Sequence, residues 1–270
     1  MYNLHCHSTH SHDGKSTVFE MCEQAIKDNL QGLAITDHVD LTLYEQRNIF
    51  NEISLSISET LKAKEIYKDK LNVLVGLEMG EATLRPDLEK EILSIGNVDF
   101  VLASRHFITA FGYESDFGYS DIPLWSNAKI GAFIEEYYSQ LYQMVDSTDF
   151  DSLSHLTLPL RYINAIYKKD YDITKHDKII ESVLSLLAKK EKALEINTSN
   201  YNSHGLFMPD EYYVKMFLSL GGKYFTVGSD SHVNTKMTNG LKEGYEFLKS
   251  LGVKDFYYYE KRKPKKFKLQ

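Results

Sequence analysis

Short apolar runs alternate with longer helical patterns along the chain, and this alternation limits the folds that the chain can adopt. The apolar runs lack the polar–apolar alternation of a half-exposed strand, so each predicts a strand that is buried on both faces. The predicted strands cover residues 2–7, 32–38, 73–78, 100–106, 152–155, 193–197 and 224–227. The predicted helices cover residues 17–29, 43–68 (one helix or a pair), 84–93, 130–145, 176–189, 210–220 and 241–251, and residues 256–259 are a candidate last strand.

This order predicts an α/β fold in which helices surround a parallel sheet. Seven such units fit a closed or nearly closed barrel, similar to a TIM barrel, better than an open doubly wound sheet. A chain of 270 residues with no Pro/Gly/Ser-rich linker, no fixed-period repeat and no low-complexity tract predicts one domain over residues 1–270.

Charge and cysteine content narrow the environment and the partners. The chain has 31 basic and 38 acidic residues, and its formal charge of −7 disfavours nucleic acid as a partner. Cys6 and Cys22 are too few to staple a domain of this size, so we predict a reducing cytoplasm. We expect no signal peptide and no membrane partner, since no run approaches the roughly 18–20 apolar residues of a membrane span. The sequence indicates no particular oligomeric state.

Side chains of the kinds that bind metals fall at or just past the carboxyl ends of nearly all the predicted strands. In a parallel barrel those ends share one face, and barrel active sites lie on that face. A chance scatter of histidines would not follow the strand ends in this way. The residues concerned are His5, His7, Asp37, His38, Glu78, His106, His155, Asn197, Asp230 and His232.

The residue types in this set indicate a metal site. Imidazole nitrogen and carboxylate oxygen together suit zinc, manganese or iron. His5 and His7 are two apart on a predicted strand and point the same way, so both can bind one ion. A carboxylate such as Glu78 has two oxygens and can bridge two ions. Taken singly, a buried histidine is more often a hydrogen-bonded core residue, and His12 stays open between a ligand, a supporting residue and a turn residue.

Six short motifs occur in order along the chain: HCHSTHSHDG, ITDH, GLEMG, SRHF, SHL and GSDSH. As an ordered set they resemble the successive motifs of the polymerase-and-histidinol-phosphatase (PHP) superfamily, over residues 4–232. The chain length and the segments HLTLPLRY, LEINTSN and FYYYEKRKP are similar to the histidinol-phosphate phosphatase branch of that superfamily. The resemblance implies a distorted (β/α)7 barrel with a trinuclear metal centre.

The resemblance also implies which residues bind the metals, and we expect two to three divalent ions of zinc, manganese or iron. Motif by motif, the first ion would be held by His5, His7, Glu78 and Asp230. Glu78 would bridge to a second ion, held with His106 and His155. The third ion would be held by Asp13, His38 and His232. Related proteins have His or Asp at the position of Asp13, and the neighbouring His12 could serve instead.

The branch that the chain resembles removes phosphate from L-histidinol phosphate in histidine biosynthesis, so the expected enzyme is a phosphoric monoester hydrolase acting on a small phosphorylated substrate. Arg161 is the best candidate phosphate anchor, because a planar guanidinium can bind two phosphate oxygens. Arg105, next to an expected ligand, is a second candidate. The segment after Asn197 lacks the basic residue of some relatives, and there only His204 could supply a charge.

The expected mechanism is hydrolysis without a covalent enzyme intermediate. Water activated by the metals attacks phosphorus, Arg161 neutralises phosphate oxygens, and either Asp230 or a metal-bound water assists the leaving alkoxide. No G-x-S-x-G motif stands between a strand and a helix, which disfavours a serine nucleophile. Residues 108–129 predict a long loop over one face, and we expect it to form part of the pocket rim and to admit only small phosphomonoesters.

Three alternatives stay open. A phosphodiesterase or nuclease of the same superfamily would use the same metals on short nucleotides, although the acidic charge disfavours a polymeric substrate. An amidohydrolase-type barrel would also place histidines at strand ends, but it would have a carboxylated lysine at a strand end, and no suitable lysine is present. A non-catalytic metal-binding module would be marked by missing ligands, and none of the expected set is missing.

Overall fold

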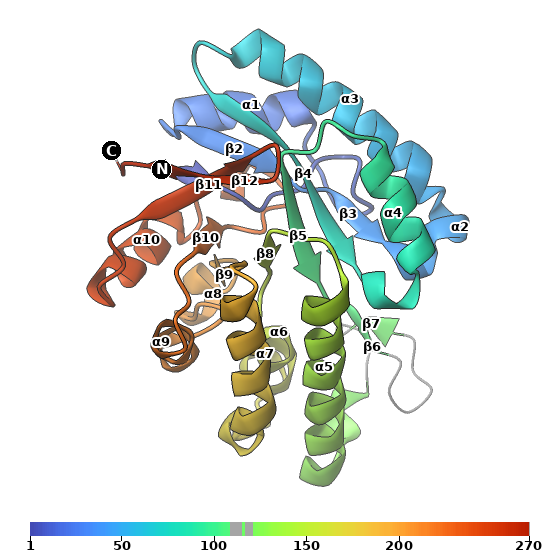
Figure 1. The fold of residues 1–270 in the computed structure, drawn as a ribbon, viewed down its shortest axis with the longest axis vertical. Helices are drawn as coiled ribbons and strands as arrows, with labels where there is room; N and C mark the ends of the chain where they lie inside the picture. Colours follow the sequence, from blue (N-terminus) through green and yellow to red (C-terminus); the bar gives the residue numbers. More distant parts are fainter. Residues whose placement is uncertain (109–114, 117–120, 270) are drawn as a thin grey trace.

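The main sheet is a parallel barrel (Figure 1). The computed structural model describes residues 1–108, 115–116 and 121–269. The strands follow the order β1 (Tyr2–Asn3), β2 (Gly32–Ile35), β4 (Asn72–Gly80), β5 (Phe100–Ser104), β8 (Ser152–Leu153), β9 (Ala193–Asn197) and β10 (Phe225–Gly228), and all pair in parallel. After a break at Thr36 and Asp37, β3 (His38–Asp40) continues from β2 and also pairs with β4. The predicted seven-stranded parallel arrangement is confirmed.

Hydrogen bonds between the first and last strands bring the sheet nearly to closure. The amide of Leu4 donates to the carbonyl of Val227 at 3.0 Å, and the amide of Asp230 donates to the carbonyl of His5 at 2.8 Å. Gly228 allows this close approach, since a Cβ at that position would lie 2.2 Å from the Cβ of His5. The segment that follows β1 is therefore fixed against the segment that follows β10.

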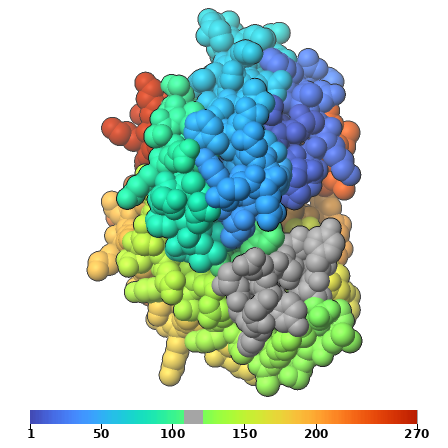
Figure 2. All heavy atoms as spheres, turned by 90° about the vertical axis from the view of Figure 1, so that its right-hand side faces the viewer, coloured from blue at the N-terminus to red at the C-terminus, as the bar shows by residue number. Residues whose placement is uncertain are grey.

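Helices cover the outside of the barrel (Figure 1), and Figure 2 shows the side on which α3 (blue) and α5 (yellow-green) lie. The predicted residues 43–68 form a pair of helices, α2 (Tyr44–Arg47) and α3. None of the described helices is long and apolar enough to cross a membrane. The longer helices are α1 (Val18–Lys27), α3 (Ile49–Tyr67), α4 (Pro86–Ser94), α5 (Asn127–Ser147), α7 (Asp177–Lys189), α9 (Glu211–Ser219) and α10 (Leu241–Ser250).

Helix α1 shows how local sequence sets these elements. Thr17 and Glu20 form a capping box, in which each side chain accepts a hydrogen bond from the other residue's backbone amide. The apolar face that 3.6-residue periodicity predicts is buried, and it consists of Val18, Met21, Cys22 and Ala25. The helix therefore begins at its cap and packs its apolar stripe against the sheet.

An antiparallel hairpin, β11 (Phe256–Glu260) and β12 (Lys263–Phe267), packs against the amino ends of the barrel strands. The ring of Tyr258 stacks on that of Tyr2 with centroids 4.6 Å apart. These rings join a buried cluster that is separate from the larger core between the sheet and the helices: Tyr2, Leu4, Ala34, Leu74, Phe100, Leu102, Ala193 and Tyr259. β11 matches the candidate last strand, whereas β12, with the basic sequence KPKKF, was not predicted.

Several short elements near the carboxyl ends of the strands were also not predicted. β6 (Phe107–Ile108) pairs with β7 (Ser115–Asp116), and α6 (Leu158–Leu160) leads into the π-helical turn η5 (Arg161–Ile166). Helix α5 starts three residues earlier than predicted, because the side chain of Ser126 caps it. The predicted loop 108–129 lies partly outside the described residues, so its place at the pocket rim stays a prediction.

Candidate metal centre

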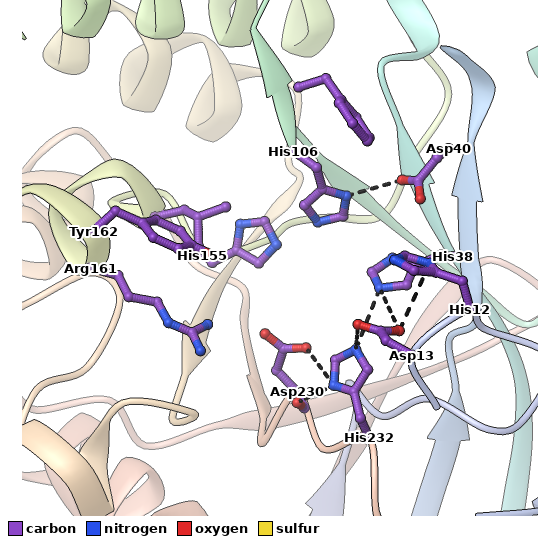
Figure 3. Close-up of a pocket in the computed structure, with 12 residues that line it drawn as sticks. His12, Asp13, His38, Asp40, His106, His155, Arg161, Tyr162, Asp230 and His232 are labelled. Carbon is purple, nitrogen blue, oxygen red and sulfur yellow. Dashed lines mark hydrogen bonds and ion pairs between the residues drawn. The ribbon is translucent and has the colours of Figure 1, made fainter. Parts of the chain in front are cut away.

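The carboxyl ends of the strands bring all the predicted metal ligands into one cluster. His5, His7 and Glu78 are fully buried at its base. Above them opens a cavity of about 280 Å³ (Figure 3). Its walls are formed by His12, Asp13, His38, Asp40, His106, Phe107, His155, Leu158, Arg161, Tyr162, Asp230 and His232.

Three donor side chains at the base, those of His5, His7 and Asp230, have the spacing of ligands to one metal ion, and Glu78 lies beside them. The Nε2 atoms of His5 and His7 lie 3.1 Å apart and are 3.5 and 3.3 Å from Asp230 Oδ1. Glu78 places Oε1 3.3 Å from His5 Nε2 and Oε2 3.5 Å from His7 Nε2. Donors bound at about 2.0–2.1 Å to one tetrahedral ion would lie about 3.3–3.4 Å apart. These residues therefore fit an ion with nitrogen and oxygen ligands.

Glu78 also faces a second group of histidines. Its Oε1 lies 3.2 Å from His106 Nε2 and 3.0 Å from His155 Nε2. Its Oε2 is buried and lies 2.8 Å from His38 Nδ1, an ion pair when that ring is protonated, but accepts no well-aligned hydrogen bond within the described part of the chain. A buried carboxylate oxygen without such a bond is costly unless a cation binds it. The position of Glu78 is thus that of a carboxylate able to bridge two ions.

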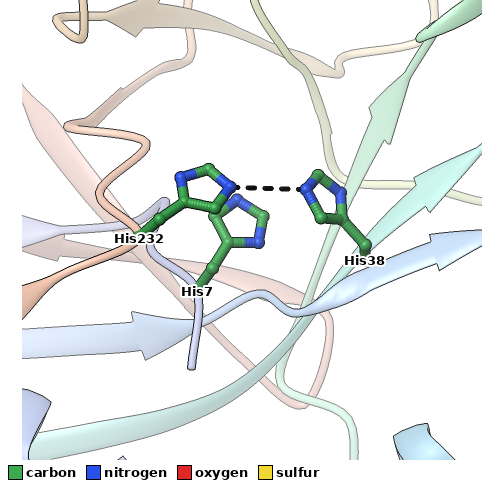
Figure 4. Close-up of side chains that lie close together, drawn as sticks. All are labelled: His7, His38 and His232. Carbon is green, nitrogen blue, oxygen red and sulfur yellow. Dashed lines mark hydrogen bonds between the residues drawn. The ribbon is translucent and has the colours of Figure 1, made fainter. Parts of the chain in front are cut away.

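A third group lies nearer to solvent. His232 Nε2 is 3.1 Å from Asp13 Oδ2 and 3.5 Å from His38 Nε2. The His7 ring stacks against both of these histidines, with centroids 4.2 Å from His38 and 4.1 Å from His232 (Figure 4). His12 meets its nearest carboxylate, Asp13, at 3.9 Å. His12, Asp13 and His38 offer ligand atoms within 4.8 Å of one another, so the structure leaves both His12 and Asp13 as candidate donors in this group.

Carboxylates hold the outer nitrogens of two of these rings. His5 Nδ1 lies 2.6 Å from Glu195 Oε1, and His106 Nδ1 lies 3.1 Å from Asp40 Oδ1. Metal-binding histidines commonly bond their second nitrogen to a carboxylate, which fixes the ring and directs the other nitrogen to the ion. The contacts behind the rings therefore also fit a metal centre.

Glu195, Asp40 and Glu81 are absent from the residues that the sequence singled out. Besides bonding His5, Glu195 accepts the backbone amide of His155 at 2.8 Å. Glu81 Oε1 accepts the backbone amide of His106 at 2.7 Å. A glutamate in the middle of the apolar run ALEIN is the signal that could have revealed Glu195, because charges are rarely buried without a partner. Asp40 and Glu81 carry no such signal.

Two other predicted strand-end residues support the site through hydrogen bonds. The buried Asp37 carboxylate accepts the backbone amide of Ser8 at 2.6 Å and the hydroxyl of Ser11 at 2.8 Å. It thereby holds the loop that follows β1. The Asn197 amide donates to Asp230 Oδ2 at 3.3 Å. Both side chains orient the candidate ligands rather than extend the donor set.

Without metal the cluster holds charged carboxylates balanced by protonated histidines, because burial opposes charge on His5 and His106 but the carboxylates outweigh it and raise the pKa of both rings well above the usual range. Burial opposes charge on Glu78, but the surrounding histidines, His5 first, outweigh it and hold the pKa of Glu78 well below its usual range. Burial also lowers the pKa of His7 to about 3, helped by His232 and His38, so this ring is in the neutral form that binds metals. For His38 burial works in the same direction, but the Glu78 carboxylate prevails and raises that pKa to about 9.

Three non-glycine residues of the site have left-handed backbone conformations. The φ angles are 23° at His155, 51° at Asp230 and 53° at Glu81. Each such conformation costs roughly 1–3 kcal/mol, and conformations of this kind gather at functional sites. These backbone conformations therefore lower the stability of the barrel and direct the three side chains toward the site.

Arg161 enters the cavity from the side opposite Asp13 (Figure 3). It is the first residue of the π-helical turn η5, and π-helical turns are frequent at functional sites. Its guanidinium lies 5.7 Å from the Tyr162 ring centroid. The structure thus brings the predicted phosphate anchor to the candidate metal centre.

The other two predicted substrate contacts do not line this cavity. Arg105 is 1% exposed, and its guanidinium has no hydrogen-bond partner among the described residues. Burial lowers its pKa, against the effect of the Glu81 carboxylate. His204 ends α8 (Tyr201–His204) and is exposed. Substrate binding by Arg105 and His204 stays a prediction that the geometry does not favour.

The fold and the site together define a parallel α/β barrel with a buried histidine–carboxylate cluster at the carboxyl ends of its strands. The family model described as PHP domain matches residues 3–199, and the chain belongs to this family.

Relatives and solved structures agree with this assignment. The chain is 29% identical over 250 residues to a Thermotoga maritima protein named "Probable histidinol-phosphatase", covering 92% of this chain and 91% of the relative. It is 26% identical over 255 residues to the histidinol-phosphatase of Lactococcus lactis subsp. lactis, covering 93% and 91%. A crystal structure of histidinol phosphate phosphatase from that organism, complexed with zinc, L-histidinol and phosphate, superposes with a TM-score of 0.78 at 24% identity over 98% of each chain, which supports the fold.

Proposed function

We propose that this protein is a metal-dependent phosphomonoesterase that hydrolyses L-histidinol phosphate to L-histidinol and phosphate in histidine biosynthesis. The observation that carries the proposal is the donor set around Glu78, which has the spacing of a metal site and faces a cavity containing Arg161. The names of the relatives support the substrate, and the L-histidinol and phosphate bound to the Lactococcus lactis enzyme support the chemistry.

We propose two to three divalent ions of zinc, manganese or iron. The first would be held by His5, His7, Glu78 and Asp230. The second would share Glu78 and add His106 and His155. A third would be held by Asp13, His38 and His232. When bound, such ions supply Lewis acidity, which polarises a phosphoryl group and makes water a nucleophile near neutral pH.

The chain's own residues would bind the phosphate and move the proton. The Arg161 guanidinium can donate two parallel hydrogen bonds to phosphate oxygens and hold the ester over the cluster. Burial opposes charge on Asp230, but His5 outweighs it and keeps the Asp230 pKa well below its usual range. Asp230 is therefore charged, the form in which a carboxylate binds a metal ion. We propose that either Asp230, after taking up a proton of the attacking water, or a water molecule in the cavity gives the proton to the leaving alkoxide.

The test is phosphate release by metal-supplemented protein from a panel of phosphomonoesters and phosphodiesters. Histidinol phosphate should give the highest kcat/KM. Faster cleavage of a phosphodiester or oligonucleotide than of any monoester would contradict the proposal and favour a nuclease of the same family. Metal analysis should show at least two equivalents per chain, and less than one after metal-supplemented growth would exclude a multinuclear centre.

We also propose a cytoplasmic location and one domain over residues 1–270. Cys6 and Cys22 are both buried free thiols, as a reducing compartment allows. The larger core cluster includes buried side chains from Cys6 to Phe256, so elements from both ends of the chain share it.

A further inference from the structure

A second cavity, of about 240 Å³, adjoins the candidate metal centre. It shares Arg161, Asp230 and His232 with the first cavity. Its remaining wall is basic and polar, with Lys15, Ser199, Ser229, Ser231, Val233, Lys236 and Asn239. Lys15 belongs to the loop after β1 and Lys236 to the 3-10 turn after β10, so the two lysines reach this space from opposite ends of the sequence.

Backbone hydrogen bonds hold the two lysine-bearing segments together. The amide of Lys15 donates to the carbonyl of His232 at 2.8 Å. The amide of Asn234 donates to the hydroxyl of Ser16 at 3.1 Å. These bonds hold the two segments side by side, so the exposed residues Lys15 and Lys236 line the same cavity.

The cavity is lined by more cations than carboxylates, and the nearby Asp13 carboxylate is 3.1 Å from His232 Nε2. Within the described ranges, Lys15, Lys236 and Arg161 form no ion pair. Asp230 is the single carboxylate among the lining residues, and it already contacts His5 and His7 at the metal centre. The excess of positive charge, from three cations with a single carboxylate that already has partners, favours an anionic ligand.

We propose that Lys15, Lys236 and Arg161 form a second oxyanion subsite, which binds a phosphate or carboxylate group beside the group held at the metals. Arg161 lies between the two cavities and can contact both groups. The oxyanion has two sources: the phosphate that has left the metal centre, or a second anionic group on a phosphomonoester other than L-histidinol phosphate, which carries none. The inference rests on the proposed function in one respect, that a phosphate group occupies the metal centre.

The first test is calorimetric titration of the metal-loaded full chain with inorganic phosphate. The wild-type protein should bind two phosphates. The double variant Lys15→Gln/Lys236→Gln should bind the second at least about fivefold to tenfold more weakly, as expected for two exposed charge contacts. Lys15→Arg/Lys236→Arg should retain it. Lys242→Gln removes an exposed lysine of α10 that does not line the cavity, and should bind both phosphates. Equal binding by the double variant and wild type would overturn the proposal.

The second test separates the two sources. The ratio of kcat/KM for 3-phosphoglycerate to that for glycerol 3-phosphate compares esters with and without a second anionic group. A fivefold to tenfold fall of this ratio in the double glutamine variant assigns the subsite to the substrate. An unchanged ratio with weaker inhibition by phosphate assigns it to the leaving product. If neither the ratio nor the inhibition changes, the subsite is excluded.

The two proposals fail separately. If the protein hydrolyses histidinol phosphate and the double glutamine variant binds phosphate as the wild type does, the proposed function stands and the subsite is excluded. A protein that hydrolyses no monoester but binds a second, lysine-dependent phosphate would lose the proposed function and keep the subsite.

Discussion

The amino and carboxyl ends of the barrel bury different kinds of side chain. At the amino end, the rings of Tyr258 and Tyr259 of the hairpin pack on Tyr2 and Phe100. At the carboxyl end, Glu78 and its neighbours are just as buried but are charged, and Glu78 Oε2 accepts no well-aligned hydrogen bond among the described residues. Aromatic burial stabilises a fold without demanding a ligand, whereas a buried carboxylate cluster demands a cation.

This contrast teaches where stability and function reside. The left-handed backbone at His155 and Asp230 adds strain at the carboxyl end, which positions side chains at a cost in stability. Substitutions at the carboxyl end should therefore change activity more than stability, and substitutions at the amino end should do the reverse. The predictions below test that separation, and all activity readouts rest on the proposed phosphatase function.

The largest effect is expected for Glu78→Gln. Replacing one oxygen of the shared carboxylate by a neutral amide should weaken two metal sites together, because both histidine groups face this side chain. We expect a loss of roughly 1000-fold or more in kcat/KM and a loss of more than one equivalent of metal. Kinetics and metal analysis on the same preparation measure both.

The matched control is Glu243→Gln, which removes a carboxylate from the exposed face of α10 and should change neither quantity. The metal-free variant should melt below the metal-free wild type, since Glu78→Gln leaves the buried histidines around it without their carboxylate partner. A loss of activity no larger than the unfolded fraction explains would show that Glu78 acts only through the fold, and the contrast between the two ends would break.

Tyr259→Ala should produce the largest loss of stability. Tyr259 is 3% exposed, and its ring lies 5.2 Å from that of Phe100, so truncation leaves a cavity inside the barrel end. Aromatic truncations of this kind cost about 3–5 kcal/mol, measured as the free energy of unfolding in urea. The folded fraction should keep near-native kcat/KM and metal content. Tyr257→Ala, on the partly exposed face of the same strand, should cost clearly less.

Arg161→Ala tests the part of the carboxyl end that is not a metal ligand. Losing one charge-assisted bidentate contact to phosphate should cost roughly 2–4 kcal/mol at the transition state, or about 30- to 1000-fold in kcat/KM. Metal content should stay full, and Arg161→Lys should recover only part of the activity, since an ammonium lacks the planar fork. Near-native kcat/KM in Arg161→Ala would move the phosphate anchor elsewhere, and loss of metal would assign Arg161 to the architecture of the site.

The sequence predicts the strands and the metal-binding residue types well for a physical reason. Strands buried on both faces must be apolar, so a run such as the one before His38 ends visibly where polar groups begin. The direction in which a side chain points cannot be predicted from the sequence in the same way. Asp37 and His38 are adjacent, and only the tertiary contacts of Asp37 with the loop after β1 make it a support rather than a candidate ligand. Arg105 beside His106 is buried away from the cavity for the same kind of reason.

Elements that depend on a distant partner were also beyond the sequence. β12 carries no apolar alternation, because its strand character comes from pairing with β11. The roles of Asp40 and Glu195 depend on rings that lie 66 and 190 residues away along the chain. Local propensity and periodicity contain no information about such pairs, so the supporting carboxylates emerge only from the folded barrel.

The smallest effect expected at the carboxyl end separates metal positioning from metal binding through Glu195. Its two oxygens face three donors: Oε1 faces His5 Nδ1 at 2.6 Å, and Oε2 accepts from the His155 amide at 2.8 Å and from Asn197 Nδ2 at 3.2 Å. In Glu195→Gln one of these donors must face an NH2 group, so either the ring of His5 or the backbone at His155 has to move. Outer carboxylates of this kind contribute about 10- to 100-fold in metal affinity.

Glu195→Gln should therefore raise the metal dissociation constant about 10- to 100-fold, while kcat at saturating metal should recover to within a few fold of wild type. The matched control is Glu89→Gln on α4, where another buried glutamate accepts the backbone amide of Asp149 at 2.7 Å and lines neither cavity. That control should lower stability without moving the metal dissociation constant. If the two variants lose metal affinity equally, the effect of Glu195 is general destabilisation, and the carboxyl end of the barrel is less specialised than its contrast with the aromatic end implies.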